Sequence, residues 1–195
     1  MKINNCFCLN TEHDFLSWYV ELLGPVFLGA KPAEILSFPQ RKEKDLIITN
    51  SIKGLFTNSK QVQYKELDFG NDCIKMFFYN PNTLDETLKE ARNLKFLKGI
   101  GYPEEYSLEV YLAQLINKIN EGNIPDEIGV FLGYPLKDVL GFIGHPSLRL
   151  TKVEGWRVYG DTRLSDEKRN AFKMAREAMK RMLEHTTPEG IVLSA

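Results

Sequence analysis

Hydrophobic residues recur along most of this chain at the spacing of an α-helix. The first stripe predicts a helix from Thr11 to about Leu23, and it consists of Phe15, Trp18, Tyr19, Leu22 and Leu23. The same spacing predicts helices over residues 46–56, 83–98, 107–121 and 136–143, and a long helix from residue 165 to about 184. Helices are therefore expected to dominate the structure.

Capping residues mark three of these expected helix starts. Thr83 followed by Glu86 is typical of a capping box, and Ser107 and Ser165 are typical N-cap residues. The last helix has an apolar stripe and a basic face, and the basic face consists of Arg169, Lys173, Arg176 and Lys180.

Shorter apolar runs predict strands between these helices. Residues 34–38 read as a short strand, and residues 62–69 and 73–79 flank a Gly70-Asn71-Asp72 turn and predict a β-hairpin. Two further strands are expected at 128–132 and, more weakly, within 150–159. The predicted fold is α+β (mixed α/β), helix-rich, with one small sheet of about four to five strands. A single domain is expected over residues 1–186, with a loose tail over 187–195.

The segment from Ile124 to Phe142 looks like the centre of the fold. Its apolar run at 128–132 is too short for a helix and predicts a buried strand. Gly133-Tyr134-Pro135 would end that strand, and Pro135 suits the first turn of the helix that follows. Glycines at 129, 133 and 141 indicate close approach of the backbone to packing neighbours or to a ligand.

Composition narrows the classes of protein without naming a reaction. The chain has 195 residues, of which 43% are hydrophobic and 26% charged, which is an ordinary globular balance. A net charge of −1 gives no general attraction to nucleic acid or to an acidic membrane. Because no apolar run approaches the roughly 20 residues that span a bilayer and the first residues lack the apolar core of a signal peptide, we expect a cytoplasmic protein with no membrane partner.

The cysteines and glycines supply no recognisable cofactor or metal motif. Cys6, Cys8 and His13 offer three possible metal ligands, but a fourth is not evident and the spacing is not that of zinc sites, so reduced thiols are the simpler interpretation. Cys73 has no histidine close in sequence. Gly99-Ile100-Gly101 lacks the third glycine of a dinucleotide fingerprint and would follow a helix rather than a strand. No cofactor-binding or metal-binding residues are therefore predicted.

Three segments of the chain together resemble a known family. Residues 127–143, Glu-Ile-Gly-Val-Phe-Leu-Gly-Tyr-Pro-Leu-Lys-Asp-Val-Leu-Gly-Phe-Ile, resemble the signature of an uncharacterised bacterial family, Domain of Unknown Function 3793. Residues 155–159 (Gly-Trp-Arg-Val-Tyr) and 29–33 (Gly-Ala-Lys-Pro-Ala) resemble two weaker family segments in the same order. The resemblance implies no reaction, because the family has no established activity.

The chain departs from the family pattern at two places. Where the family often has His-Cys-Ala-Pro, this chain has Leu22-Leu23-Gly24-Pro25, and where the family often has Pro-His-Glu-Ile-Gly, residue 126 is an aspartate. If the family residues form a thiol–imidazole or metal site, this chain lacks it. If they are structural, nothing follows for function.

The first functional hypothesis is a binding module for a small ligand or partner. Polar residues embedded in the three family-like segments would form its site, namely Lys31, Glu127, Tyr134, Asp138 and Tyr159. Two of these residues also have a structural explanation. Asp138 suits the dipole at a helix start. Trp156, Arg157 and Tyr159 could line a pocket, but aromatic residues in a short strand more often belong to the core.

Two further hypotheses belong to other classes. A hydrolase or transferase would use Glu127 or Asp126 as general base, although adjacent residues of a strand point to opposite faces and would not act together. A binder of an acidic partner or of RNA would use the basic last helix through residues such as Arg169, Lys173 and Lys180. The sequence leaves ligand, cofactor and oligomeric state open.

Overall fold

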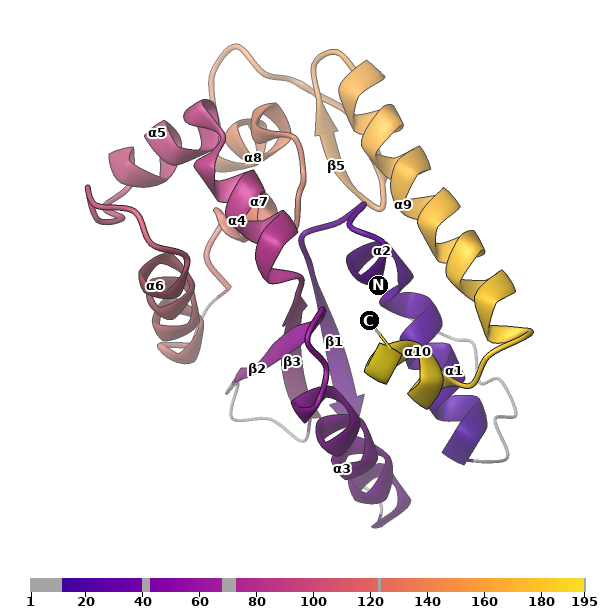
Figure 1. The fold of residues 1–195 in the computed structure, drawn as a ribbon. Coiled ribbons are helices and arrows are strands. Elements are labelled where there is room, and N and C mark those ends of the chain that lie inside the picture. The colour runs from indigo at the N-terminus through magenta and orange to yellow at the C-terminus, as the bar shows by residue number, and fades with distance from the viewer. Residues whose placement is uncertain (1–11, 40–42, 68–72, 123, 195) are drawn as a thin grey trace.

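The computed structural model describes residues 12–39, 43–67, 73–122 and 124–194. Within these ranges the chain forms ten helices and five strands (Figure 1). The helix-rich α+β class expected from the sequence is confirmed. The five strands, however, divide between a three-stranded and a two-stranded sheet instead of forming one.

The larger sheet contains β1 (Ala33–Pro39), β2 (Gln63–Leu67) and β3 (Cys73–Tyr79) in the order β1-β3-β2, with both pairings antiparallel. The predicted β2–β3 hairpin and the strand at 34–38 are thus confirmed. Successive side chains of β3 point to opposite faces of the sheet. Met76 and Phe78 are buried in one hydrophobic cluster, whereas Phe77 and Tyr79 are buried in another, so the central strand joins two cores.

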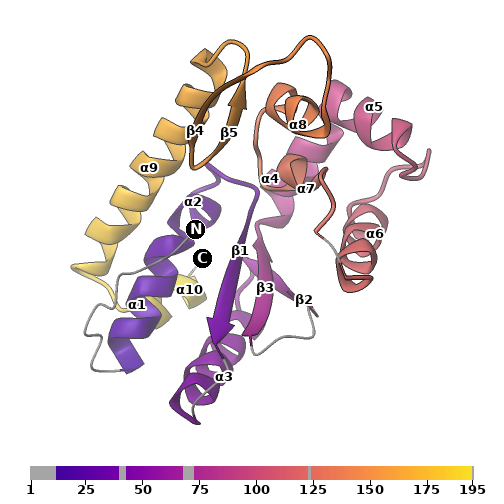
Figure 2. The same ribbon diagram turned by 180° about the vertical axis from the view of Figure 1, so that it is seen from behind.

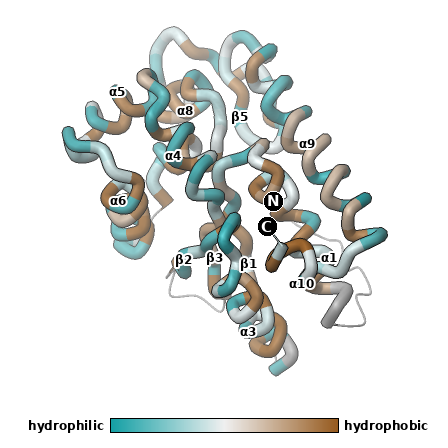
Figure 3. Tube along the Cα trace, in the orientation of Figure 1, coloured by the Kyte–Doolittle hydropathy of each residue, from teal (hydrophilic) through white to brown (hydrophobic). Residues whose placement is uncertain are grey.

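Helices from the two ends of the chain cover the Met76–Phe78 face. They are α1 (Glu12–Leu22), α2 (Gly24–Phe27), α3 (Glu43–Thr57), α9 (Arg163–Leu183) and α10 (Pro188–Ser194). Figure 1 shows α9 lying alongside α1 and α2, and in Figure 3 hydrophilic and hydrophobic segments alternate along α9. We expected a loose tail after residue 187, but Ile191 and Val192 of α10 are buried in this core, which corrects that prediction.

The middle of the chain covers the opposite face, around Phe77 and Tyr79. It forms α4 (Pro81–Lys89), α5 (Ala91–Gly99), α6 (Leu108–Asn120), α7 (Ile128–Phe131) and α8 (Leu136–Ile143), as seen from behind in Figure 2. The expected helix over 83–98 is divided at Glu90 into α4 and α5. No helix in the described ranges is long and apolar enough to cross a membrane.

Two of the three predicted caps were wrong. The Asn80 side chain caps α4 by accepting hydrogen bonds from the backbone N–H groups of Asn82 and Thr83, so Thr83 is not the cap. Ser165 lies inside the first turn of α9, which begins at Arg163, and its hydroxyl bonds to another helix instead. Ser107 does cap α6, with Oγ accepting from Val110 N at 3.2 Å.

The segment that we expected to be a buried strand at 128–132 is the short helix α7. Its backbone bonds are local, since Val130 N donates to Glu127 O at 2.9 Å and Leu132 N donates to Ile128 O at 2.9 Å. A four-residue apolar run carries no periodicity that separates a buried strand from a buried helical turn. Asp126 and Glu127 consequently precede a helix, and the argument that strand geometry separates them does not apply.

The second sheet is the hairpin of β4 (Leu150–Glu154) and β5 (Trp156–Tyr159), within the weakly strand-like stretch of the sequence. It lies between α8 and α9 (Figure 2). Gly141 lets α8 approach β5 closely, because a Cβ there would lie 2.2 Å from Tyr159 Cγ. This packing places two of the family-like segments, residues 127–143 and 155–159, side by side.

Candidate functional site

The Gly133-Tyr134-Pro135 turn fixes the position of Tyr134 between α7 and α8. Gly133 has a φ of +76° and packs on Pro32, where a Cβ would come within 2.5 Å of Pro32 Cδ. A side chain at this position would be strained by its backbone and by its neighbour. Tyr134 N also donates to Gly129 O at 2.8 Å, so the turn holds the tyrosine at one place on the surface of the fold.

Tyr134 stacks on Trp156 of β5, with ring centroids 4.6 Å apart and ring planes 14° from parallel. Phe172 of α9 contacts Trp156 with a centroid distance of 6.1 Å. Burial raises the pKa of the Tyr134 hydroxyl, which therefore stays protonated near neutral pH. The stacked pair joins the turn, the small sheet and α9.

Lys31 packs against this aromatic group. Its side chain is 6% exposed, and Nζ lies 5.5 Å from the ring centroids of both Tyr134 and Phe172. Nζ also donates to Glu34 Oε2 at 2.6 Å. Its charge thus has a carboxylate partner and two aromatic faces within the fold, which accounts for Lys31 as a packing residue.

Asp138 is the most highly connected carboxylate of the site. It is 2% exposed and accepts four hydrogen bonds, from Lys137 Nζ at 2.6 Å, Ser165 Oγ at 2.6 Å, Tyr159 N at 2.8 Å and Trp156 Nε1 at 2.8 Å. Burial alone would raise the pKa of Asp138, but these donors outweigh burial and lower it. One carboxylate thus connects α8, β5 and α9 and fixes the indole of Trp156.

Tyr159 belongs to this support and does not line an opening. It is 8% exposed, its ring covers Gly141, and its carbonyl accepts a hydrogen bond from Lys137 Nζ at 2.9 Å.

Glu127 does not converge with the other predicted site residues. It is 6% exposed and accepts hydrogen bonds from Lys118 Nζ at 2.6 Å and from the Tyr102 hydroxyl at 3.2 Å. Burial first, and then the neighbouring Glu127 charge, raise the pKa of Tyr102. Glu127 therefore ties the start of α7 to α6 and to the loop after α5, and its carboxylate is committed to that contact.

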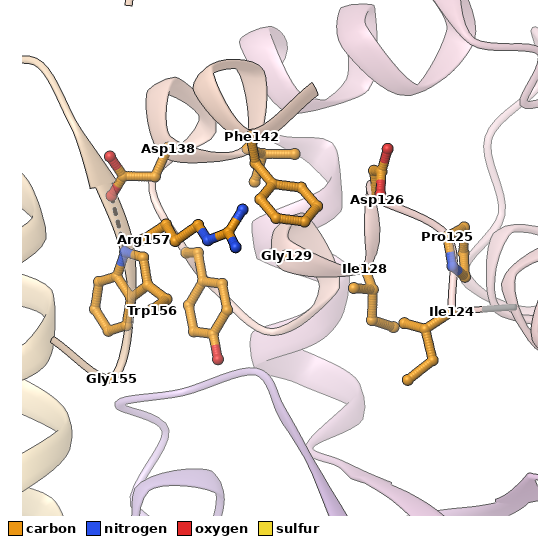
Figure 4. Close-up of a pocket in the computed structure, with 12 residues that line it drawn as sticks. Ile124, Pro125, Asp126, Ile128, Gly129, Asp138, Phe142, Gly155, Trp156 and Arg157 are labelled. Carbon is orange, nitrogen blue, oxygen red and sulfur yellow. Dashed lines mark hydrogen bonds between the residues drawn. The ribbon is translucent and has the colours of Figure 1, made fainter. Parts of the chain in front are cut away.

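A cavity of about 450 Å³ opens beside the stacked pair, between α7, α8 and β5 (Figure 4). Its lining is mostly apolar and consists of Ile124, Pro125, Asp126, Ile128, Gly129, Tyr134, Asp138, Val139, Phe142, Gly155, Trp156 and Arg157. Arg157 reaches from β5 to the ring of Phe142, with its guanidinium carbon 5.4 Å from the centroid. Three aromatic rings and two exposed charges therefore meet at one opening.

The cavity contains three of the six residues singled out from the sequence. Tyr134, Asp138 and Asp126 line it, Lys31 and Tyr159 lie behind its aromatic wall, and Glu127 lies apart. Phe142 was not singled out in advance, because its exposure at the end of α8 depends on how that helix packs. The sequence analysis named Trp156 and Arg157 as possible pocket residues, although packing in the core was the commoner alternative.

The other candidate residues are the basic residues of α9 and the possible metal ligands near the N-terminus. Arg169 of the basic helix is paired with Asp166 and, at 3.2 Å, with Glu154, and Arg176 is paired with Glu21 at 2.8 Å. Cys6, Cys8 and the side chain of His13 lie outside the described part of the chain. Among the described side chains, no three His, Cys, Asp or Glu residues are grouped so that they could hold a metal ion.

Fold and site together define a helix-rich α+β protein with an aromatic pocket between two short helices and a hairpin. The chain belongs to the family described as Protein of unknown function (DUF3793), whose model matches residues 20–192. The resemblance of the three sequence segments is thereby confirmed, and the family carries no established function. No curated protein and no solved structure matches the chain.

Proposed function

We propose that this protein binds a small organic ligand in the cavity between α7, α8 and β5. The observation that supports this proposal is the combination of an apolar, aromatic lining with a volume of about 450 Å³. Ligand pockets commonly have volumes of about 300–1,000 Å³ and are lined mainly by apolar and aromatic side chains with a few polar groups. This cavity has both properties.

Preorganisation of the walls also supports a binding function. Trp156 is fixed on one side by stacking with Tyr134 and at its N–H by Asp138. A ligand would therefore meet a surface that is already ordered, and little conformational entropy would be lost on binding.

Binding accounts for these residues better than general-base catalysis by Glu127. That carboxylate is buried with Lys118 and Tyr102, away from the cavity lining. Asp126 does line the cavity, so the enzymatic alternative now depends on Asp126 alone. A role for the basic face of α9 is less favoured, because Arg169 and Arg176 already have carboxylate partners.

Indole, an uncharged aromatic probe, tests the cavity directly. We expect one indole to bind per chain with a Kd of about 1 mM or lower, as for a small ligand that buries most of its surface. Isothermal titration calorimetry on the full chain, supported by ligand-observed NMR, measures this affinity.

Two tryptophan substitutions locate the binding site. Ile124→Trp places a large ring at the edge of the cavity, where Ile124 is 43% exposed, and we expect it to weaken indole binding at least about tenfold. Ile100→Trp is the matched control, because Ile100 is 39% exposed and lies outside the cavity lining. The absence of saturable binding to the wild type, or equal effects of the two variants, would contradict the proposed function.

A further inference from the structure

Two charged side chains of the cavity have no charged partner within the fold. Neither Asp126 nor Arg157 forms an ion pair or a side-chain hydrogen bond with any described residue, and the guanidinium carbon of Arg157 lies 5.4 Å from the centroid of the Phe142 ring. The third charged residue of the lining, Asp138, is instead saturated by four donors. The two free charges are therefore set apart from the charges that hold the fold together.

These two charges come from opposite sides of the opening. Arg157 extends from β5 towards Phe142, whereas Asp126 lies beside Ile128 in the segment that leads into α7 (Figure 4). They line the same cavity but do not pair with each other. A positive and a negative group thus face one cavity with aromatic and aliphatic surface between them.

This arrangement selects a particular charge pattern in the ligand. A guanidinium matches the two oxygens of a carboxylate through parallel hydrogen bonds, and a carboxylate such as Asp126 accepts hydrogen bonds from an ammonium group. A ligand with only one charge would pair with only one of the two side chains. A ligand with both charges would satisfy both side chains.

We propose that the cavity binds a zwitterionic small molecule with a flat apolar body, such as an aromatic amino acid or a compound of that class. Its carboxylate binds Arg157, its ammonium binds Asp126, and its body packs among Phe142, Tyr134 and Trp156. This inference rests on the proposed function and specifies the chemical class of the ligand.

Four indole compounds separate the contributions of the two charges. Indole has neither charge, indole-3-propionate has the carboxylate, tryptamine has the ammonium, and L-tryptophan has both. We expect each partly exposed charge contact to strengthen binding about threefold, so that L-tryptophan binds about tenfold more tightly than indole. Calorimetry with the full chain at one low salt concentration measures all four affinities.

Two charge-removing variants test which side chain binds which group. Arg157→Met removes the guanidinium and keeps an unbranched apolar stem at this position, and it is expected to weaken indole-3-propionate and L-tryptophan about threefold without changing tryptamine or indole. Asp126→Asn is expected to weaken tryptamine and L-tryptophan by a similar factor without changing the other two compounds. Arg92→Met, at an exposed position of α5 outside the cavity lining, is the control and should change none of the four affinities.

The outcomes distinguish this inference from the proposed function. If indole binds in the cavity but L-tryptophan binds no more tightly, or if the two variants affect all four compounds equally, the inference about the zwitterion is overturned and the binding function stands. If none of the four compounds binds, the binding function itself is contradicted.

Discussion

Two aspartates line the same cavity and have opposite surroundings. Asp138, with its donors Lys137, Trp156, Tyr159 and Ser165, forms what we call the inner wall, and it is buried with four hydrogen bonds. Asp126 and Arg157, with Ile124 and Phe142, form the rim, where both charged side chains are exposed and have no ion-pair partner among the described residues. Residue type alone therefore does not distinguish the two carboxylates, whereas their hydrogen bonds do.

The difference has a simple physical origin. A buried carboxylate without donors is strongly unfavourable, so a fold that contains one must supply donors for its oxygens. At Asp138 these donors come from a neighbouring lysine, a strand and a helix, which makes the carboxylate part of the scaffold. A charge at the rim stays in water and needs no partner, so it remains available to a ligand.

The largest predicted effect follows from removing the inner-wall carboxylate. Asp138→Ala leaves the Trp156 and Ser165 donors without an acceptor and Lys137 without its counter-charge, and we expect the free energy of unfolding to fall by about 3–5 kcal/mol. Chemical denaturation followed by circular dichroism measures the change. Asp138→Asn keeps the shape and one acceptor oxygen and should cost less. A loss below about 1 kcal/mol for Asp138→Ala would show that the inner wall does not support the fold.

The same contrast explains which parts of the fold could be predicted from the sequence. The helix near the N-terminus and the β2–β3 hairpin were predicted because their apolar spacing and turn residues are local signals. Residues 128–132 were assigned wrongly because four apolar residues fit either buried structure. Ile191 and Val192 looked like a loose tail because their burial depends on α1 and α3, which lie more than a hundred residues earlier in the chain.

The sequence predicted some of the residues that lie near the candidate site, but not which partners their side chains bind. Tyr134 and Asp138 were singled out by their place in a family-like segment, and both line the cavity. The donors that satisfy the Asp138 carboxylate lie up to 27 residues away in sequence, at Ser165. Glu127 likewise meets Lys118 only because α6 folds back towards α7. Such long-range pairing has no signature in a single sequence.

An effect of intermediate size on the free energy of unfolding is expected at low pH. The pKa of Asp138 is lowered in the folded protein, so its stabilising contribution is fully present above the unfolded value of about 3.9 and is lost as the pH falls towards and through the folded value. The stability difference between the wild type and Asp138→Asn should therefore narrow below about pH 4, because only the wild type loses a charge at this position.

Carbon-13 NMR of the Asp138 carboxyl, assigned by comparison with Asp138→Asn, tests the sign of this shift. We expect a titration midpoint below about 3.9. A midpoint at or above that value, or a stability difference that remains constant down to about pH 2, would mean that the four donors do not outweigh burial and that ionisation of Asp138 adds no net stability to the fold.

The smallest effect on stability is expected at the rim. Asp126→Asn and Arg157→Met should each change the free energy of unfolding by less than about 1 kcal/mol. Neither side chain has an ion pair to lose, and an exposed cation–π contact such as that of Arg157 with Phe142 is worth about 0.5–1 kcal/mol. Denaturation under the conditions used for Asp138→Ala measures both. A loss above about 1 kcal/mol at either position would place that residue in the scaffold and remove the distinction between wall and rim. If stability is unchanged, any loss of affinity for a charged indole compound reports a contact with the ligand, because the walls that surround it are the same.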